Sequence, residues 1–163
     1  MPRSSSIHTR GARVGPAAAR PRGRRLFSAS VRVYLCRHAK AAPGDPDEAR
    51  ELTGKGRRQA EELGARLAAL SEPPATVLSS PLVRARQTAQ AIATATGAPL
   101  EIDTRLAPGA TILHLREAVA GRPGPVATVG HQPDCSEIAL AATGRDPGFA
   151  PGAMAQLDVE PAP

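Results

Sequence analysis

Short apolar runs alternate with longer amphipathic segments between residues 31 and 159. The short runs are rich in Val, Leu and Ile, as buried strands are, whereas the longer segments carry Leu and Ala on one helical face. The pattern predicts strands at 31–36, 75–79, 100–103, 126–130 and 153–159, and helices at 53–70, 81–96, 111–120 and 133–143. Such alternation indicates an α/β fold with a mainly parallel sheet and helices on both faces. The last strand, reached through FAPGA, is expected to be an antiparallel edge strand.

The first predicted strand ends at an adjacent arginine and histidine, in VRVYLCRH at 31–38. Sites in open α/β sheets gather at the carboxyl ends of strands, where Arg37 and His38 would hold a phosphate beside a nucleophile. A pair of this kind is more often part of an exposed loop, so these two residues do not establish a site by themselves.

A second strand-to-helix junction, ATVLSSPLVRARQTAQAI, adds another arginine. Ser80 suits the N-cap of the following helix, and Pro81 suits its first position. Arg84 shares a helix face with Thr88 through the four-residue spacing, while Arg86 is turned away. Arg84 is therefore expected to point back toward the strand ends, and Arg86 is not.

A third junction, VATVGHQPDCSEIALAATG, brings a second histidine to the same edge. Gly130 and His131 follow an apolar strand, and Pro133 opens the next helix. The free N–H groups at that helix N-terminus would add affinity for an anion. Together the three junctions place two arginines and two histidines on one rim without a carboxylate, which predicts a phosphate pocket.

Four motifs occur in the order and spacing typical of the histidine phosphatase superfamily. They are RHAK at 37–40, LTGKGRRQA at 52–60, SSPLVRARQT at 79–88 and VGHQPD at 129–134. Over about residues 31–160 the chain resembles the small SixA-type phosphohistidine phosphatase branch. The resemblance implies the α/β fold shared with phosphoglycerate mutases. It also implies that the second motif opens the first helix and does not touch substrate.

The resemblance also implies a role for each residue of the rim. His38 would be the nucleophile that is transiently phosphorylated, and His131 would be the second catalytic histidine. Arg37 and Arg84 would bind the phosphoryl oxygens. The expected substrate-binding positions are Arg37, Arg84, Ser80 and Gly130.

The chemistry of phosphoryl transfer agrees with these roles. An attacking imidazole must be neutral, and neighbouring guanidinium groups lower its pKa because they disfavour a second positive charge. Arginine binds two phosphoryl oxygens at once, through a planar fork that does not deprotonate. The sequence has no Cys/His spacing for zinc, no acidic cluster for magnesium and no GxxxxGK[ST] loop. We therefore expect no metal and no cofactor.

The sequence lacks a carboxylate where many phosphomonoesterases and mutases of this superfamily carry a general acid. That acid comes from the segment between the second and third junctions, but the loop expected at 106–111 contains none. Glu101, Asp103 and Glu117 lie near it without being suitably placed. A protonated phosphohistidine can lose its imidazole without an acid from the enzyme, so the gap favours a phosphoramidate over a sugar phosphate. Three acids in the loop after RHAK stay open as alternatives: Asp45, Asp47 and Glu48.

The net charge of +6 comes from the start of the chain. Residues 1–30 hold seven arginines and no acid, which leaves 14 basic and 15 acidic residues, a net charge of −1, in residues 31–163. That balance is not typical of a nucleic-acid binder. We predict a histidine phosphatase domain at 31–163, preceded by a disordered Arg-rich tail at 1–30.

The tail allows three interpretations. Arginine far outnumbers lysine, and Ala, Gly and Pro are abundant, as in GC-rich coding sequences, so the start could be mis-assigned and Val31 could be the first residue. The tail could instead be a functional basic segment, similar to a transit peptide or a nucleic-acid arm, or an inert extension. No apolar segment is long enough for secretion or membrane insertion, so we expect a cytoplasmic protein without membrane contact.

The main expectation is a monomeric, metal-free phosphatase that works through a phosphohistidine intermediate. Its substrate would be a phosphorylated protein, carrying phosphohistidine in signalling or phosphotransfer. An alternative of the same class is a phosphomonoesterase acting on a small phosphate compound. An alternative of a different class is a non-catalytic phosphate-binding module, which the presence of both histidines and both arginines disfavours.

Overall fold

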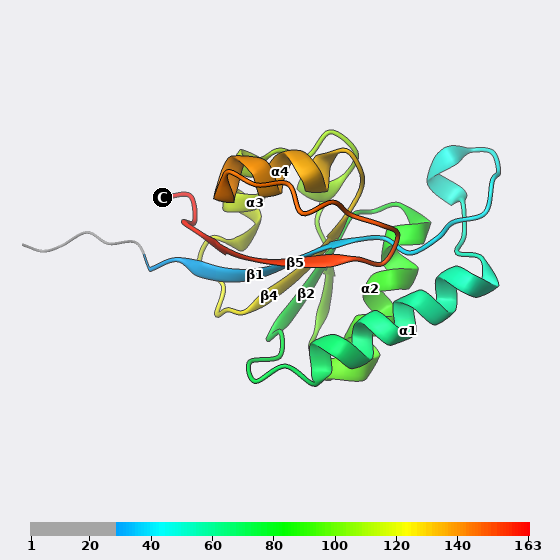
Figure 1. Cartoon of the computed structure of the whole chain (residues 1–163), viewed down its shortest axis with the longest axis horizontal. Helices are drawn as coiled ribbons and strands as arrows, with labels where there is room; N and C mark the ends of the chain where they lie inside the picture. Colours follow the sequence, from blue (N-terminus) through cyan, green and yellow to red (C-terminus); the bar gives the residue numbers. More distant parts are fainter. Residues whose placement is uncertain (1–28) are drawn as a thin grey trace, which may run out of the picture.

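A computed structural model describes residues 29–163, whose strands form a sheet in the order β3-β2-β4-β1-β5 (Figure 1). The strands are β1 (Val31–Arg37), β2 (Thr76–Ser79), β3 (Leu100–Ile102), β4 (Val126–Gly130) and β5 (Met154–Val159). The first four strands run parallel to one another, whereas β5 pairs antiparallel with β1 at one edge of the sheet. The predicted mainly parallel sheet with an antiparallel edge strand is confirmed.

Helices cover both faces of this sheet (Figure 1). On one face lie α1 (Gly54–Ala68) and α2 (Val83–Thr96), and on the other lie α3 (Ile112–Val119) and α4 (Asp134–Thr143). Two short 3₁₀ turns, η1 (Asp47–Ala49) and η2 (Thr104–Leu106), lie in the connections that follow β1 and β3.

Strand β1 shows how the core is divided between the two faces. Val33 and Leu35 belong to the apolar cluster that α3 and α4 cover, whereas Tyr34 and Cys36 belong to the cluster under α1 and α2. Successive side chains of a strand point to opposite faces, so a strand covered on both sides reads as a continuous apolar run. Burial on both faces therefore fixes the position of β1, and with it the positions of Arg37 and His38 at its end.

The register of the parallel strands aligns their carboxyl ends. Arg37 lies opposite Gly130 in the pairing of β1 with β4. The backbone N–H of His38 donates to the carbonyl of Gly130 at 3.0 Å, and that of Ser80 donates to the carbonyl of Val129 at 3.0 Å. The ends of β1, β4 and β2 therefore lie in one row.

Helix α1 begins against the segment that follows His38. Thr53 is its N-cap, and the Thr53 hydroxyl accepts from the backbone N–H of Gly56 at 2.9 Å. The backbone N–H of Thr53 donates to the carbonyl oxygen of Lys40 at 2.9 Å. A Cβ atom at Gly56 would lie 2.0 Å from the same carbonyl oxygen, so only glycine allows this approach. The motif LTGKGRRQA at 52–60 therefore opens the first helix, as predicted.

The predicted start of α2 is wrong by two residues. The helix begins at Val83, and Leu82 takes the N-cap position with extended backbone and no capping side chain. Ser80 lies two residues before this N-cap and therefore does not cap the helix; its hydroxyl accepts from the backbone N–H of Leu82 at 3.3 Å and lies 2.7 Å from His131. Pro133 likewise precedes α4 as its N-cap and does not form its first turn.

The strands and helices described above all lie within residues 31–163. The predicted tail, except for Ala29 and Ser30, lies outside the described residues. Within the described part of the chain, no helix combines the length and the apolar character needed to cross a membrane.

Candidate active site

Two histidines and two arginines meet at the aligned strand ends. Arg37 and His38 end β1, His131 follows β4, and Arg84 comes from the first turn of α2. The ring centroids of His38 and His131 are 5.3 Å apart. The Nε atom of Arg84 lies 3.3 Å from Nε2 of His38. The side chains that the sequence singles out as catalytic thus share one site.

The imidazole of His38 is held neutral with its lone pair on Nε2. Nδ1 lies 2.7 Å from the carbonyl oxygen of Ala39, which can only accept, so Nδ1 carries the proton. Burial lowers the pKa of His38 to about 4, the bond to Ala39 opposes this, and the charges of nearby guanidinium groups, Arg84 first, add to the lowering. A neutral imidazole of this tautomer is a nucleophile at Nε2.

His131 is almost fully buried, with 3% of its surface exposed. Its Nε2 atom lies 2.7 Å from the hydroxyl oxygen of Ser80, while its Nδ1 atom has no hydrogen-bond partner within the described residues. Burial lowers the pKa of His131 to about 4, and repulsion from His38, when protonated, and from Arg84 acts in the same direction. The second histidine is therefore also neutral near pH 7.

Ser80 is fully buried between the second and third junctions. Its hydroxyl oxygen accepts from the backbone N–H of Leu82 at 3.3 Å and lies against His131. The hydroxyl can donate to Nε2 of His131, or its second lone pair can accept from Nε2 when the ring carries its proton there. The geometry thus joins Ser80 to the second histidine, and its predicted contact with substrate stays a prediction.

Arg84 is placed by the helix face that the sequence indicates. It is 6% exposed and points toward His38, whereas Arg86 is exposed to solvent. The hydroxyl of Thr88, one turn later, donates to the carbonyl of Arg84 at 2.8 Å and accepts from the backbone N–H of Ala39 at 3.0 Å. Thr88 therefore ties α2 to the residue after His38. The prediction that Arg84 and Arg86 point in different directions is confirmed.

Arg37 and Gly130 lie side by side at the ends of β1 and β4. One terminal nitrogen of Arg37 donates to the carbonyl oxygen of Phe149 at 2.8 Å, and its Nε atom has no partner within the described residues. That anchor leaves other N–H groups of the guanidinium available to an anion. Gly130 uses its carbonyl to hold His38, and its predicted part in substrate binding stays a prediction.

The loop between β1 and α1 adds two residues that the four motifs do not include. Nη1 and Nη2 of Arg84 donate to the backbone oxygen and Oδ2 of Asp47, at 2.8 and 3.1 Å. Arg50 donates to the other carboxylate oxygen of Asp47 at 2.9 Å. Asp47 stays open from the sequence as a possible acid, but Arg50 was missed. Its one signal is a lone arginine within the acidic stretch DPDEARE.

Two acids between the second and third junctions, Glu101 and Asp103, are paired with arginines of the same segment. Asp103 accepts from Arg105 at 2.7 Å, and this bond lowers the pKa of the Asp103 carboxyl. Glu101 is ion-paired with Arg122. Their pairing agrees with the expectation that this segment supplies no general acid.

The N-terminus of α4, predicted to attract an anion, carries a negatively charged side chain. Asp134 lies in the first turn of the helix, and its carboxylate accepts from the backbone N–H groups of Gly109 and Ala110, at 2.8 and 3.2 Å. A negative side chain thus occupies this end of the helix dipole. The predicted contribution of this helix end to anion binding stays a prediction.

Histidine, cysteine and acidic side chains do not gather in threes as possible metal ligands anywhere in residues 29–163. The positive charge of the site comes from arginine side chains. Guanidinium groups can neutralise a phosphoryl group without exchange of ligands or protons.

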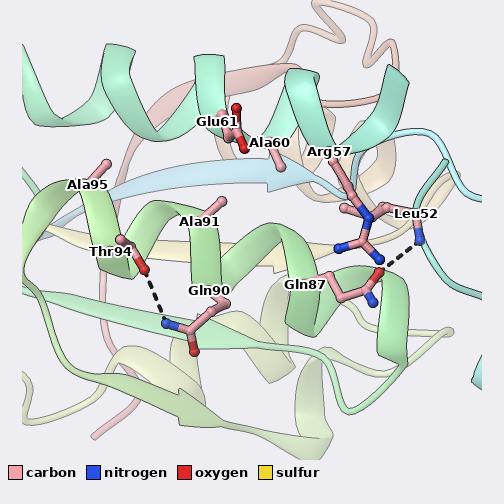
Figure 2. Close-up of a pocket in the computed structure, with 9 residues that line it drawn as sticks. All are labelled: Leu52, Arg57, Ala60, Glu61, Gln87, Gln90, Ala91, Thr94 and Ala95. Carbon is pink, nitrogen blue, oxygen red and sulfur yellow. Dashed lines mark hydrogen bonds between the residues drawn. The ribbon is translucent and has the colours of Figure 1, made fainter. Parts of the chain in front are cut away.

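A cavity of about 400 Å³ lies between α1 and α2, and none of the four catalytic candidates lines it (Figure 2). At its edge, the side-chain oxygen of Gln87 accepts from the backbone N–H of Leu52 at 2.8 Å (Figure 2). The amide nitrogen of Gln87 donates to Glu51 at 3.1 Å. These bonds tie the end of the loop that carries Asp47 and Arg50 to α2.

Comparisons with known proteins agree with this geometry. Residues 33–108 match the model of the histidine phosphatase superfamily (branch 1). A solved structure assigned as the phosphohistidine phosphatase SixA of Agrobacterium tumefaciens is 32% identical, with 78% of this chain and 91% of that one covered and a TM-score of 0.69. Another assigned as SixA, from Nakamurella multipartitia, is 28% identical, with coverages of 78% and 83% and a TM-score of 0.62. An uncharacterised protein of Picosynechococcus sp. is 36% identical over 119 residues, 68% of this chain and 72% of the relative.

Proposed function

This chain belongs to branch 1 of the histidine phosphatase superfamily, and from that membership we propose that it removes phosphate from phosphohistidine on a protein, through an intermediate on His38. The observation that carries the proposal is the state of His38. Its proton is fixed on Nδ1, its lone pair is on Nε2, and Nε of Arg84 lies 3.3 Å from that atom. A neutral nucleophile beside fixed positive charge is what phosphoryl transfer requires.

In the first step Nε2 of His38 forms a bond to phosphorus, and the bond between phosphorus and the leaving nitrogen breaks. The substrate ring is protonated on its other nitrogen, so the bonding electrons stay with the leaving nitrogen and a neutral imidazole departs. Arg84 and Arg37 stabilise the negative charge spread over the phosphoryl oxygens. Arg84 must release Nε2 when phosphorus takes its place.

In the second step water attacks phosphorus, and the electrons of the phosphorus–nitrogen bond return to Nε2 of His38. The attacking water loses a proton. His131 is a candidate base for that proton in the tautomer that carries its own proton on Nε2, against the Ser80 oxygen. The lone pair is then on Nδ1, which has no partner within the described residues, and the ring centroid lies 5.3 Å from that of His38. Ser80 would hold the ring of His131 in its orientation.

Two observations support phosphohistidine as the substrate class. The segment that often supplies a general acid in this superfamily has its acids at positions 101 and 103 paired with arginines. In addition, two solved structures similar to this chain are assigned as phosphohistidine phosphatases. A phosphoramidate can be protonated before its bond breaks, so it tolerates the lack of an enzyme acid.

A small-molecule phosphomonoesterase is the second candidate function, because Asp47 lies on the phosphate-binding arginine. Acting as an acid would require Asp47 to be protonated. Hydrogen bonds from Arg50 and Arg84 hold the pKa of its carboxyl below the usual range, which opposes that role.

Phosphoenzyme trapping tests the proposal. Brief reaction with a ³²P-labelled phosphohistidine protein should leave acid-labile label on the wild-type enzyme and none on His38→Ala, with His38→Ala still folded by circular dichroism. Turnover should fall by at least about 10³-fold in that variant. Label retained by His38→Ala and lost in His131→Ala would reverse the roles of the two histidines. Release of phosphate from sugar phosphates but not from phosphohistidine would favour the second candidate.

A further inference from the structure

Asp47 places a carboxylate at the exposed side of the candidate active site. Its Oδ2 atom lies 3.1 Å from Nη2 of Arg84, and its Oδ1 atom lies 2.9 Å from Nη1 of Arg50. Among the residues that the structure describes, Asp47 is the one acid that is ion-paired with Arg37, Arg84 or Arg50. The site therefore combines an anion-binding arginine with one fixed negative charge.

That carboxylate can accept further hydrogen bonds but is a poor proton donor. Two arginines hold the pKa of the Asp47 carboxyl below its usual range, so it is ionised near neutral pH. An ionised carboxylate offers about four acceptor positions, and the two arginines use two of them through its side chain. The side chain is 61% exposed, so the remaining positions face the solvent from which a substrate enters.

We propose that Asp47 is a specificity residue whose carboxylate binds the cationic leaving group of a phosphoramidate substrate, such as the protonated ring of a phosphohistidine. The inference rests on the proposed function and deepens it. Asp47 is joined to Arg84, and Arg84 is joined to the nucleophilic nitrogen, so a phosphoryl group on that arginine brings its leaving group close to the carboxylate.

The reaction balances without a proton from Asp47. A phosphorylated histidine ring that is protonated on its other nitrogen donates that N–H to Asp47. When Nε2 of His38 bonds to phosphorus, the phosphorus–nitrogen bond breaks and its electrons remain on the leaving nitrogen. A neutral imidazole then departs with the N–H still on its other nitrogen. The carboxylate thus favours the protonated form of the substrate, whose leaving group departs readily.

The same charge acts against phosphate esters. The leaving oxygen of an ester gains negative charge as its bond to phosphorus breaks, and a nearby carboxylate repels that charge. One side chain therefore shifts the preference of the site in two directions, toward leaving nitrogen atoms and away from leaving oxygen atoms.

The test compares Asp47→Asn with wild type on phosphoramidate, a phosphohistidine peptide and p-nitrophenyl phosphate. Loss of a charge-assisted hydrogen bond predicts that kcat/KM falls about tenfold on both nitrogen-linked substrates, mainly through KM. On the aryl ester kcat/KM should stay within about twofold of wild type or rise. Glu48→Gln is the matched control, since Glu48 is the next residue, is also exposed and forms no ion pair among the described residues.

Equal losses on all three substrates would overturn the inference, because they would show that Asp47 acts only by holding Arg84. A loss confined to esters with poor leaving groups would overturn it as well, since Asp47 would then be a general acid. Both outcomes leave the proposed function intact if the wild type hydrolyses phosphohistidine. A wild-type enzyme that hydrolyses only esters would refute the proposed function and the inference together.

Discussion

At the scale of single residues, the site depends on groups that can only donate or only accept a hydrogen bond. The carbonyl of Ala39 can only accept, so it fixes the tautomer of His38. Arg84 distributes its N–H groups between Nε2 of His38 and Asp47. The site is therefore organised before a phosphate binds, which reduces the reorganisation needed during the reaction.

The two arginines at the start of α2 give a matched comparison. Arg84→Ala should lower kcat/KM by about 10²-fold or more, because it removes fixed charge at the reacting phosphoryl group. Arg86→Ala removes the same charge from an exposed position on the same helix and should change kcat/KM by less than about twofold. Steady-state kinetics on one substrate, with melting curves for both variants, measure the difference. Similar losses at both positions would contradict the orientation of Arg84.

The buried histidines predict how stability depends on pH. The pKa values of His38 and His131 are lowered to about 4 in the folded protein, so the unfolded chain binds more protons between about pH 4 and 6.5. This contribution to stability is complete above about pH 6.5 and is lost as the pH falls toward 4.

Urea unfolding between about pH 7.5 and pH 5 should therefore show a lower midpoint at the acid end. His38→Asn removes one of the two titrating groups and should reduce the change in midpoint over this range. A variant with the same pH dependence as wild type would mean that folding does not lower the pKa of His38.

At the scale of elements, two helix starts position the site. α1 begins against the backbone of Lys40, two residues after His38, and α2 begins just before Arg84. Thr88 and Gln87 bond from α2 to the backbone of Ala39 and Leu52. The segment after β1 is thus held at both ends by helices, which fixes the loop that contains Asp47.

The glycines at the start of α1 test this packing. A Cβ atom at Gly56 would lie 2.0 Å from the carbonyl oxygen of Lys40, whereas one at Gly54 would have its nearest neighbour 3.8 Å away, in the flexible side chain of Arg58. Gly56→Ala should cost about 1–3 kcal/mol or more in the free energy of unfolding, because backbone must move. It should also lower kcat, since the displaced backbone follows His38.

Gly54→Ala is the control in the same helix turn and should be neutral or slightly stabilising, because alanine restricts the unfolded chain. Urea unfolding of both variants and the wild type measures the difference. Equal stability of the two variants would contradict the close approach of α1 to Lys40.

At the scale of the whole molecule, the basic charge and the site belong to different parts of the chain. Residues 1–30 carry seven arginines and no acid, while the described sheet, helices and candidate catalytic residues lie in 31–163, which has a net charge of −1. Two arginines of the described domain, Arg37 and Arg84, lie where the strand ends meet. This arrangement suits recognition of a phosphoryl group more than of a nucleic-acid backbone.

Deletion of residues 1–30 should leave the melting temperature and kcat/KM on phosphohistidine nearly unchanged, because the described elements and site residues all follow that segment. Thermal unfolding and kinetics of the full and shortened chains measure the effect. A large fall in melting temperature would show that the tail packs on the domain.

Local patterns were sufficient to predict the alternation of strands and helices and the residues at their junctions. The apolar run of β1 predicts where Arg37 and His38 stand, and helix periodicity separates Arg84 from Arg86, because both depend on neighbours within a few residues. Because parallel strands run in the same direction, their carboxyl ends lie at the same edge of the sheet, and the residues that follow them meet there.

Contacts between distant segments were decided only by the tertiary structure. The hydroxyl of Ser80 bonds to His131, 51 positions away, and the N-cap of α2 is Leu82. Asp47 bonds to both Arg84 and Arg50 from a loop whose sequence has no regular period. A hydroxyl or carboxylate has several possible partners of similar energy, and the partner it takes depends on which segments packing brings within about 3 Å.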